Sequence, residues 1–444
     1  MALTGMQIYK NLPRTNCKDC GLPTCMAFAM QVAAKQRALT DCPHISAEGQ
    51  ASLSEAAAPP MKLVKIGAGE KIFEFGQETV MFRHEDKFHR SCGIAALLPA
   101  SLSDEELTDA IKNVNQRVFM RVGAQLRISF AALEISGCKD PAARAALAVE
   151  MSERPLILVG GDVEEMRAAV KAAADARPLI YRADSSSIDG LAALAAEARL
   201  PLAVAGEDLP ELADNAARAK ESGVEEIVLS FDGADPGETV RTLTIARRAA
   251  LKKQFRGLGF PTIVAVEAQD PDMECILAGM FAAKYAGIVM IRGFEPWELL
   301  PIMTTVQDVY TDPQVPNTVE AKLYEIGNPG PDAPVLFTTN FSLTYFSVEG
   351  EVERSKIPTY IAVVDTEGLG VLNAYAGDKI SAEQVVKTLQ NQKVLEKVSH
   401  RRLIIPGLLP IFRAEIEDTS DWKEVIIGPE TAREIPAFLN KVWK

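Results

Sequence analysis

Four cysteines near the start of the chain have the residue type and spacing of a metal site. Cys17, Cys20, Cys25 and Cys42 follow the pattern C-x2-C-x4-C-x16-C, and Pro43 comes directly after the last of them. Four thiolates can hold a 4Fe-4S cluster, and a tight cysteine pair with a proline after the final ligand recurs in such sites. Structural zinc, the main alternative, usually takes two separated C-x2-C or C/H pairs, whereas this chain has one short pair. A disulfide framework is disfavoured because seven cysteines in 444 residues are too sparse for one. The pattern therefore predicts an iron-sulfur cluster and a protein that moves electrons.

Composition restricts the classes of partner. The chain has 444 residues, a net charge of −13, and a hydrophobic share of 48% that is ordinary for a globular protein. Its sequence pI of about 5.1 disfavours nucleic acid or an anionic membrane as the main partner. No apolar run approaches the ~20 residues needed to span a bilayer. The first residues lack the apolar core and cleavage site of a signal peptide. We therefore expect a cytoplasmic protein with neither a nucleic-acid nor a membrane partner.

The elements that must position the cysteines and any second site fall into three segments. Residues 1–60 form the expected cluster domain and end in a linker-like stretch of small and polar residues. Residues 61–312 begin with alternating apolar and polar positions, typical of a hairpin collar. Eight short apolar runs separated by amphipathic helical stretches follow, which is the count for a closed (β/α)8 barrel; an open doubly wound sheet is the alternative. The expected barrel strands are residues 92–98, 127–133, 156–160, 179–183, 202–205, 226–231, 262–267 and 287–291.

A proline-rich stretch separates the barrel from the last segment. Residues 313–334 contain five prolines in irregular sequence, which predicts a linker and a fairly stiff hinge. Residues 335–444 then show four more strand-helix units. This pattern predicts a small, open, parallel sheet of the Rossmann-like or flavodoxin-like type.

The order of these three parts resembles one family over essentially the whole chain. That family is the large (gamma) subunit of the corrinoid iron-sulfur protein of the anaerobic acetyl-CoA pathway. The segment "KNLPRTNCKDCGLPTCMAFAMQVAAKQ" carries the resemblance most strongly, and "GQETVMFRHEDKF" and "GLGVLNAYAGDK" support it. The resemblance implies a methyl group carried on the cobalt of a bound, cobalamin-type corrinoid. A methyltransferase loads the methyl group from methyltetrahydrofolate, and acetyl-CoA synthase/CO dehydrogenase receives it. It also implies a small partner subunit, itself a barrel, that forms a heterodimer with this chain.

The corrinoid is expected at the carboxyl ends of the last sheet, where open parallel sheets bind ligands. Glycines and small side chains there would let the backbone approach a flat macrocycle, while Asn and Thr could hydrogen-bond its amides. Without the resemblance, ordinary glycine-rich loops would explain the same residues equally well. The candidate corrinoid-binding residues are Thr339, Asn340, Leu343, Thr344, Gly368, Gly370, Val371, Leu372, Asn373, Ala374, Gly407, Leu408, Gly428, Pro429 and Arg433.

No histidine is suitably placed to bind cobalt from below. His400, the one histidine of the last segment, lies at the start of a strand and so at the wrong end of the sheet. The expected corrinoid is therefore base-off, with no protein imidazole on cobalt. That arrangement favours Co(I), the nucleophile that takes the methyl group. The cluster is then expected to return oxidised Co(II) to Co(I).

Other reactive residue types carry weaker expectations. Cys92, Cys138 and Cys275 stand alone, as buried small hydrophobes usually do. The polar residues at the barrel's strand ends are not assigned a catalytic role, and whether the chain is itself an enzyme stays open. Two other functions compete with the methyl carrier: an electron-transfer subunit of a redox complex, and a methyltetrahydropterin:corrinoid methyltransferase that uses its own barrel.

Overall fold

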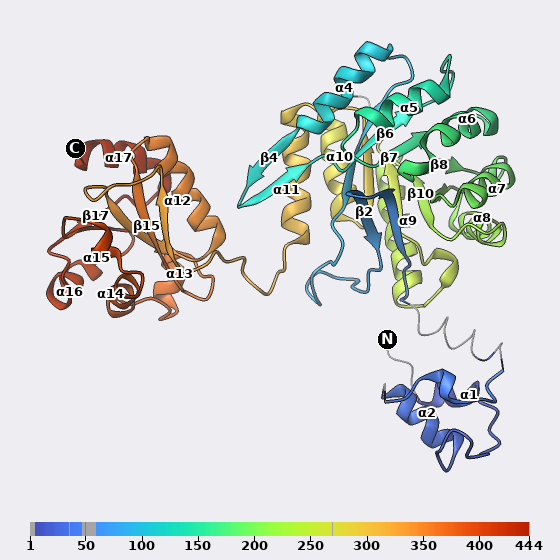
Figure 1. The fold of residues 1–444 in the computed structure, drawn as a ribbon, viewed down its shortest axis with the longest axis horizontal. Helices are drawn as coiled ribbons and strands as arrows, with labels where there is room; N and C mark the ends of the chain where they lie inside the picture. The colour runs from blue at the N-terminus through green and yellow to red at the C-terminus, as the bar shows by residue number, and fades with distance from the viewer. Residues whose placement is uncertain (1–4, 35, 47–48, 50–58, 269, 444) are drawn as a thin grey trace. The chain divides into compact units, whose positions relative to one another are not determined.

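The computed structural model describes the chain apart from residues 1–4, 35, 47–48, 50–58, 269 and 444 (Figure 1). The chain divides into two compact units. The first comprises Met1–Met81, His89–Asn115 and Ile128–Val306, and the second comprises Phe82–Phe88, Gln116–Arg127 and Gln307–Lys444.

The N-terminal cysteines lie in a small helical segment. It consists of α1 (Gly5–Lys10), α2 (Cys25–Ala33) and the 3-10 turn η1 (Leu39–Asp41). Ile8 and Phe28 are buried together with two of the cysteines, so the thiols form part of the small core themselves. Such a core has few apolar residues to stabilise it, and small domains of this kind usually depend on a bound metal or another cross-link.

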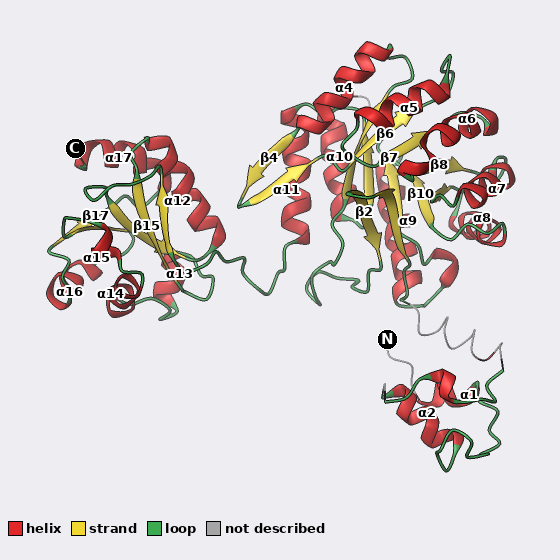
Figure 2. Ribbon diagram, viewed as in Figure 1, coloured by secondary structure: helices red, strands yellow, loops and turns green. Residues whose placement is uncertain are grey.

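Eight parallel strands close into a barrel, as the eight apolar runs predicted (Figure 2). Every residue of the first, third and fifth of these strands is buried or nearly so, which is why their sequences are apolar throughout. The strands are β3 (Gly93–Leu98), β6 (Phe130–Glu134), β7 (Leu156–Val159), β8 (Leu179–Ala183), β9 (Leu202–Val204), β10 (Ile227–Asp232), β11 (Thr262–Ala265) and β12 (Ile288–Ile291).

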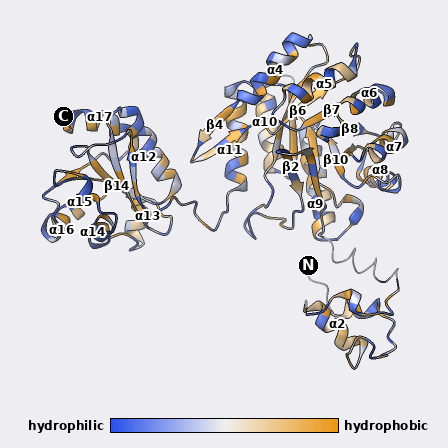
Figure 3. Cartoon of the chain, viewed as in Figure 1, coloured by the Kyte–Doolittle hydropathy of each residue, from blue (hydrophilic) through white to orange (hydrophobic). Residues whose placement is uncertain are grey.

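Amphipathic helices surround the barrel, with their apolar sides toward the strands (Figure 3). Five of them begin at an aspartate that accepts a hydrogen bond from the backbone N–H three residues later: Asp140, Asp162, Asp208, Asp235 and Asp270. The helices are α4 (Asp104–Gln116), α5 (Pro141–Met151), α6 (Val163–Ala173), α7 (Ile188–Ala198), α8 (Leu209–Glu221), α9 (Pro236–Leu251), α10 (Pro271–Ala283) and α11 (Pro296–Tyr310), with 3-10 turns η2 (Ala174–Ala176) and η3 (Arg256–Leu258). Among the residues described, no helix combines the length and apolarity needed to cross a bilayer.

The expected collar is a hairpin that closes one end of the barrel. Strands β1 (Leu63–Ala68) and β2 (Lys71–Gly76) pair antiparallel, and their apolar side chains join the barrel core. The backbone of the hairpin bonds to the carbonyl groups of Arg177 and Gly259, which precede β8 and β11. The hairpin therefore covers the amino ends of the strands and leaves the carboxyl end of the barrel open.

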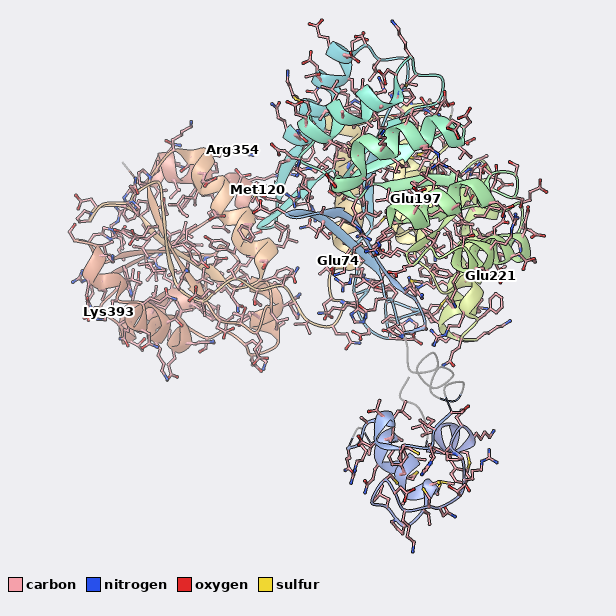
Figure 4. The ribbon with its side chains drawn as sticks, turned by 45° about the vertical axis from the view of Figure 1, so that its right-hand side comes forward. Glu74, Met120, Glu197, Glu221, Arg354 and Lys393 are labelled. Atoms are coloured by element: carbon pink, nitrogen blue, oxygen red, sulfur yellow. The ribbon has the colours of Figure 1, made fainter. Side chains whose placement is uncertain are left out.

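A second hairpin was not predicted. Strands β4 (Val118–Arg121) and β5 (Ala124–Arg127) stand between α4 and β6, whereas the amphipathic pattern of residues 103–119 predicted a helix that would run into β4. The helix instead ends at Gln116. Met120 of this hairpin is exposed (Figure 4).

The last sheet has five strands in the order β13-β15-β14-β16-β17. Four are parallel, as predicted: β14 (Val335–Thr339), β15 (Thr359–Val364), β16 (Arg402–Ile405) and β17 (Glu424–Ile427). The prediction that residues 313–334 are only a linker needs correction, because β13 (Leu323–Ile326) lies within them and pairs antiparallel with β15. The parallel strands, numbered along the chain, have the order 2-1-3-4 of flavodoxin-like folds.

Helices cover both faces of this sheet. Helices α12 (Ser342–Ser355) and α17 (Ile435–Val442) pack on one face, and α14 (Ala382–Asn391) and α16 (Phe412–Thr419) pack on the other. The short helices α13 (Val371–Ala376) and α15 (Val394–Lys397) and the turn η4 (Ala432–Glu434) complete the domain.

Candidate functional site

Three of the four predicted cluster ligands come together in the N-terminal core. Cys25 and Cys42 are buried, and Cys20 packs against them. Cys25 begins α2, where Asn16 Oδ1 accepts a hydrogen bond from its backbone N–H at 2.9 Å. Cys17 is exposed. All four thiols are free, so none is committed to a disulfide.

The loop that carries the first two cysteines has an unusual backbone. Arg14, Asn16 and Lys18 have φ values of 57°, 51° and 71°, in the left-handed region that non-glycine residues seldom adopt. The N–H groups of Lys18, Asp19 and Cys20 donate to no other group among the described residues. Alternating left-handed residues can direct successive N–H groups toward an anionic group. The loop and its thiols therefore fit an anionic iron-sulfur cluster.

Two further side chains of metal-ligand type lie beside Cys17. The ligand atoms of Cys17, Asp19 and His44 all lie within 4.8 Å of one another. His44 Nε2 is 2.5 Å from Asp19 Oδ2, and this hydrogen bond, with a smaller contribution from Cys17, holds the pKa of Asp19 below its usual value. Sequence reasoning did not single out this pair, although Asp19 adjoins Cys20 and His44 follows Pro43.

The last sheet has a cavity at its topological switch point. Helices leave the neighbouring strands β14 and β16 toward opposite faces of the sheet, and in flavodoxin-like folds the ligand binds at this position. The cavity has a volume of about 270 Å³ and a mostly apolar lining. It brings together five of the predicted residues: Thr344, Val371, Leu408, Gly428 and Pro429. Thr338, Val348 and Phe438 also line it and were not predicted.

Exposed apolar side chains surround the carboxyl edge of this sheet. The predicted residues Leu343, Leu372 and Leu408 are exposed, and they follow β14, β15 and β16 respectively. Tyr375 and Ile411, which were not predicted, are exposed on the same segments. A group of exposed apolar residues at a ligand-binding edge indicates an interaction surface.

Asn340 connects two loops. Its Oδ1 accepts hydrogen bonds of 3.0 Å from the Thr366 and Gly368 N–H groups and from the Thr366 hydroxyl. Its Nδ2 donates to Asp365 at 2.8 Å. Thr339 is also fully buried. The Oδ1 atom of Asn340 is therefore engaged within the protein, and one of the two Nδ2 hydrogens remains for the expected bond to a corrinoid amide.

Two glycines allow the neighbouring loops to touch. A Cβ atom on Gly407 would lie 2.5 Å from the Gly428 carbonyl oxygen, which no side chain could tolerate. The Gly407 N–H donates to the Pro429 carbonyl at 3.1 Å. These glycines position the loops after β16 and β17 against each other.

The remaining predicted residues lie around or outside the cavity. Gly370 caps α13, Asn373 is exposed on that helix, and Ala374 is fully buried beneath it. Arg433 is exposed in η4 and borders a separate hollow with Arg354 of α12 (Figure 4). The structure therefore does not bring Arg433 into the 270 Å³ cavity.

His400 is fixed at the other end of the sheet. It precedes β16, its Nε2 lies 2.8 Å from the Ala333 carbonyl, and its Nδ1 accepts a hydrogen bond from the Arg402 N–H. Both ring nitrogens are therefore engaged at the amino end of the strand.

The open end of the barrel holds a polar cavity of about 850 Å³. Asp184 and Asp232 line it together with Arg182. The Asp184 carboxylate accepts hydrogen bonds from the hydroxyl and N–H groups of Ser186 and Ser187, and these bonds lower its pKa to about 2. Asp184 therefore stabilises the turn after β8. The thiols outside the N-terminal segment show no activation, since burial raises the pKa of Cys92 to about 12.

Comparison with known proteins gives full-length matches. The family model described as CO dehydrogenase/acetyl-CoA synthase delta subunit matches residues 63–439, and an Fe-S cluster model matches residues 12–44. The corrinoid/iron-sulfur protein large subunit of Moorella thermoacetica is 41% identical over 99% of this chain and 98% of its own length. The acetyl-CoA decarbonylase/synthase complex subunit gamma of Methanothermobacter thermautotrophicus is 33% identical over 100% of this chain and 99% of its own. The same subunit of Methanopyrus kandleri is 35% identical over 99% and 98%.

Proposed function

The chain belongs to the CO dehydrogenase/acetyl-CoA synthase delta subunit family, with the corrinoid/iron-sulfur protein large subunit among its relatives, and we propose that it is a corrinoid-bound methyl carrier. The main support is that one chain combines two sites. Four free cysteines, three of them grouped in a small core, lie in one compact unit. An apolar cavity at the switch point of a flavodoxin-like sheet lies in the other.

The corrinoid would be held by the segments after β14, β15 and β16. Bound there, its cobalt supplies a nucleophile that accepts and releases a methyl group. Leu343, Leu372 and Leu408 give the macrocycle an apolar surface, and the 270 Å³ cavity can take an apolar substituent of the cofactor. The engaged ring of His400 supports a base-off cofactor without protein imidazole.

The N-terminal site would hold a 4Fe-4S cluster. Cys17, Cys20, Cys25 and Cys42 supply four thiolates, and the loop amides around Lys18 stabilise negative charge. A cluster held there would supply the single electron that returns accidentally oxidised Co(II) of the corrinoid to Co(I). We assign residues 1–60 to this cluster domain, residues 61–312 to the barrel and residues 335–444 to corrinoid binding.

The methyl group requires a donor and an acceptor. We propose that a methyltransferase provides it from methyltetrahydrofolate and that acetyl-CoA synthase/CO dehydrogenase receives it. A carrier must present the same cofactor to two enzymes in turn, and the prolines between the barrel and β13 suit a segment that links a presenting domain. The relative's name, "large subunit", also implies a smaller subunit.

Filling the cavity tests this proposal. Thr344→Trp places a large ring in the cavity from α12, so the anaerobically purified variant should lose its corrinoid absorption bands. Glu353→Trp is the matched control, because it puts the same ring at an exposed position of the same helix. Iron content should stay unchanged in both variants. A wild-type protein with iron-sulfur absorption and no corrinoid would contradict the proposal and favour an electron-transfer subunit.

A further inference from the structure

The exposed cysteine of the N-terminal segment has a carboxylate beside it. The Sγ atom of Cys17, a carboxylate oxygen of Asp19 and a ring nitrogen of His44 all lie within 4.8 Å of one another. No other three side chains of metal-ligand type come this close together among the residues that the structure describes. Of the other three predicted cluster ligands, two are buried and one is partly buried. Cys17 is therefore the predicted ligand at the surface, and Asp19 is its charged neighbour.

A hydrogen bond fixes this carboxylate in place. His44 Nε2 lies 2.5 Å from Asp19 Oδ2, and His44 is the donor because an ionised carboxylate can only accept. Since His44 lies two residues after Cys42, the bond joins the segment of the last predicted ligand to the loop of Cys17. The same bond, with a smaller contribution from the Cys17 thiol, holds the pKa of Asp19 below its usual value. Asp19 is therefore an ordered negative charge at neutral pH.

No strong cation neutralises this charge. Asp19 forms its ion pair with His44, and no lysine or arginine among the described residues pairs with it. Asp41, the other aspartate next to a predicted ligand, is arranged differently. Its carboxylate accepts a hydrogen bond from the Ala38 N–H at 3.2 Å and lies 3.8 Å from Arg37. Asp19 is therefore the carboxylate of this segment that combines a short distance to a thiol with the absence of a guanidinium partner.

The charge of Asp19 acts on a bound cluster through Cys17. Four thiolates satisfy the four irons of a 4Fe-4S cluster, so Asp19 remains a neighbour of a ligand and not a ligand itself. When Cys17 binds iron, its thiol proton is released, and a thiolate then stands beside the carboxylate. Reduction adds one further negative charge to the cluster. A nearby carboxylate opposes that electron by Coulomb repulsion, and the charge around a cluster is one of the factors that set its potential.

We propose that the Asp19 carboxylate lowers the midpoint potential of the cluster and so makes the reduced cluster a stronger one-electron donor. His44 is the positioning residue that holds this carboxylate beside Cys17. The inference rests on the proposed function for the presence of the cluster. Returning Co(II) to Co(I) requires a strong reductant, which is what a destabilised reduced cluster supplies. The loop amides around Lys18 act in the opposite sense, because they stabilise negative charge, and Asp19 offsets part of their effect.

A redox titration of the anaerobic protein tests the proposal, with the reduced cluster followed by electron paramagnetic resonance. Asp19→Asn removes the charge at constant size. It should increase the ratio of reduced to oxidised cluster about threefold at a given potential, a positive shift of about 30 mV for one electron. Asp19→Glu keeps the charge and should shift less. Asp41→Asn is the matched control, because it removes a carboxylate that is paired with Arg37, and it should titrate as the wild type does.

Iron content, measured on the same samples, separates an effect on potential from loss of the cluster. If Asp19→Asn does not retain the cluster, Asp19→Ser provides a second neutral variant for the titration. Loss of iron from both variants would make Asp19 a ligand or a structural support and would overturn the assignment. Equal potentials of Asp19→Asn and the wild type would also overturn it, as would equal shifts in Asp19→Asn and Asp41→Asn.

The wild-type protein reports on the proposed function separately. A wild-type chain without iron would refute the cluster, and this inference with it. A wild-type chain that holds both the cluster and the corrinoid, but whose potential does not respond to Asp19→Asn, would refute the role of Asp19 alone and leave the methyl carrier standing.

Discussion

At the scale of single residues, Asn340 shows how one residue type can serve two purposes. From sequence it was a candidate to bond corrinoid amides, because it ends a strand at a ligand-binding edge. In the structure its side chain joins the loop after β14 to the loop after β15. An amide has the same donors and acceptors for either task, so only the positions of its neighbours could distinguish them.

Replacing Asn340 should therefore destabilise the last domain. Asn340→Ala leaves the N–H groups of Thr366 and Gly368 buried without partners, at a cost of about 2–4 kcal/mol in the free energy of unfolding. Asn373→Ala is the control, because Asn373 is exposed on α13. Chemical denaturation of both variants measures the difference. Equal stability of Asn340→Ala and the wild type would show that these hydrogen bonds contribute little.

At the scale of elements, the strength of the sequence signal decided which parts could be predicted. Strands such as β3 are buried on both faces, and their continuous apolar runs identified the barrel. Strand β13 has four residues, none of them fully buried, and the hairpin strands β4 and β5 resemble it in length and exposure. Such short segments lack an apolar run or a long enough alternation, so their pairing depends on contacts that sequence does not reveal.

The collar, which was predicted, depends on a buried ion pair. Glu78 bonds Arg247 of α9 at 3.0 Å, and it also accepts the N–H groups of His89 and Arg90. Because both charged side chains are buried, Glu78→Ala removes a buried carboxylate from the Arg247 guanidinium and from two backbone N–H groups, and it should cost about 3–5 kcal/mol in the free energy of unfolding.

Thermal unfolding of this variant checks the expectation. Glu70→Ala, at the exposed turn between β1 and β2, should change stability by less than about 0.5 kcal/mol. Equal melting temperatures of the two variants would show that the Glu78–Arg247 pair does not stabilise the collar.

At the scale of the whole molecule, the sequence predicted the parts and their order, but not the inner arrangement of the second site. The cysteine pattern, the eight apolar runs and the last sheet could all be identified because each is repetitive or closely spaced. The 270 Å³ cavity is different, because it combines residues from β14, β16, α12 and α17. Thr338, Val348 and Phe438 were missed, since nothing in their local sequence separates a cavity lining from an ordinary core.

The two sites should have separable tasks, and the cysteines provide the test. Cys20→Ala removes one thiolate and should lower or alter the iron content, while corrinoid content stays at the wild-type level because the sites lie in different compact units. Protein reduced chemically beforehand should still accept a methyl group at the wild-type rate. After oxidation in air, the variant should recover much more slowly than the wild type when a protein electron donor is supplied. Cys138→Ala, which removes a partly buried barrel thiol, controls for loss of a cysteine as such and should behave as the wild type. Failure of the pre-reduced Cys20→Ala variant to take up the methyl group would mean that the cluster acts in the transfer itself, and the separation of tasks proposed for this chain would be wrong.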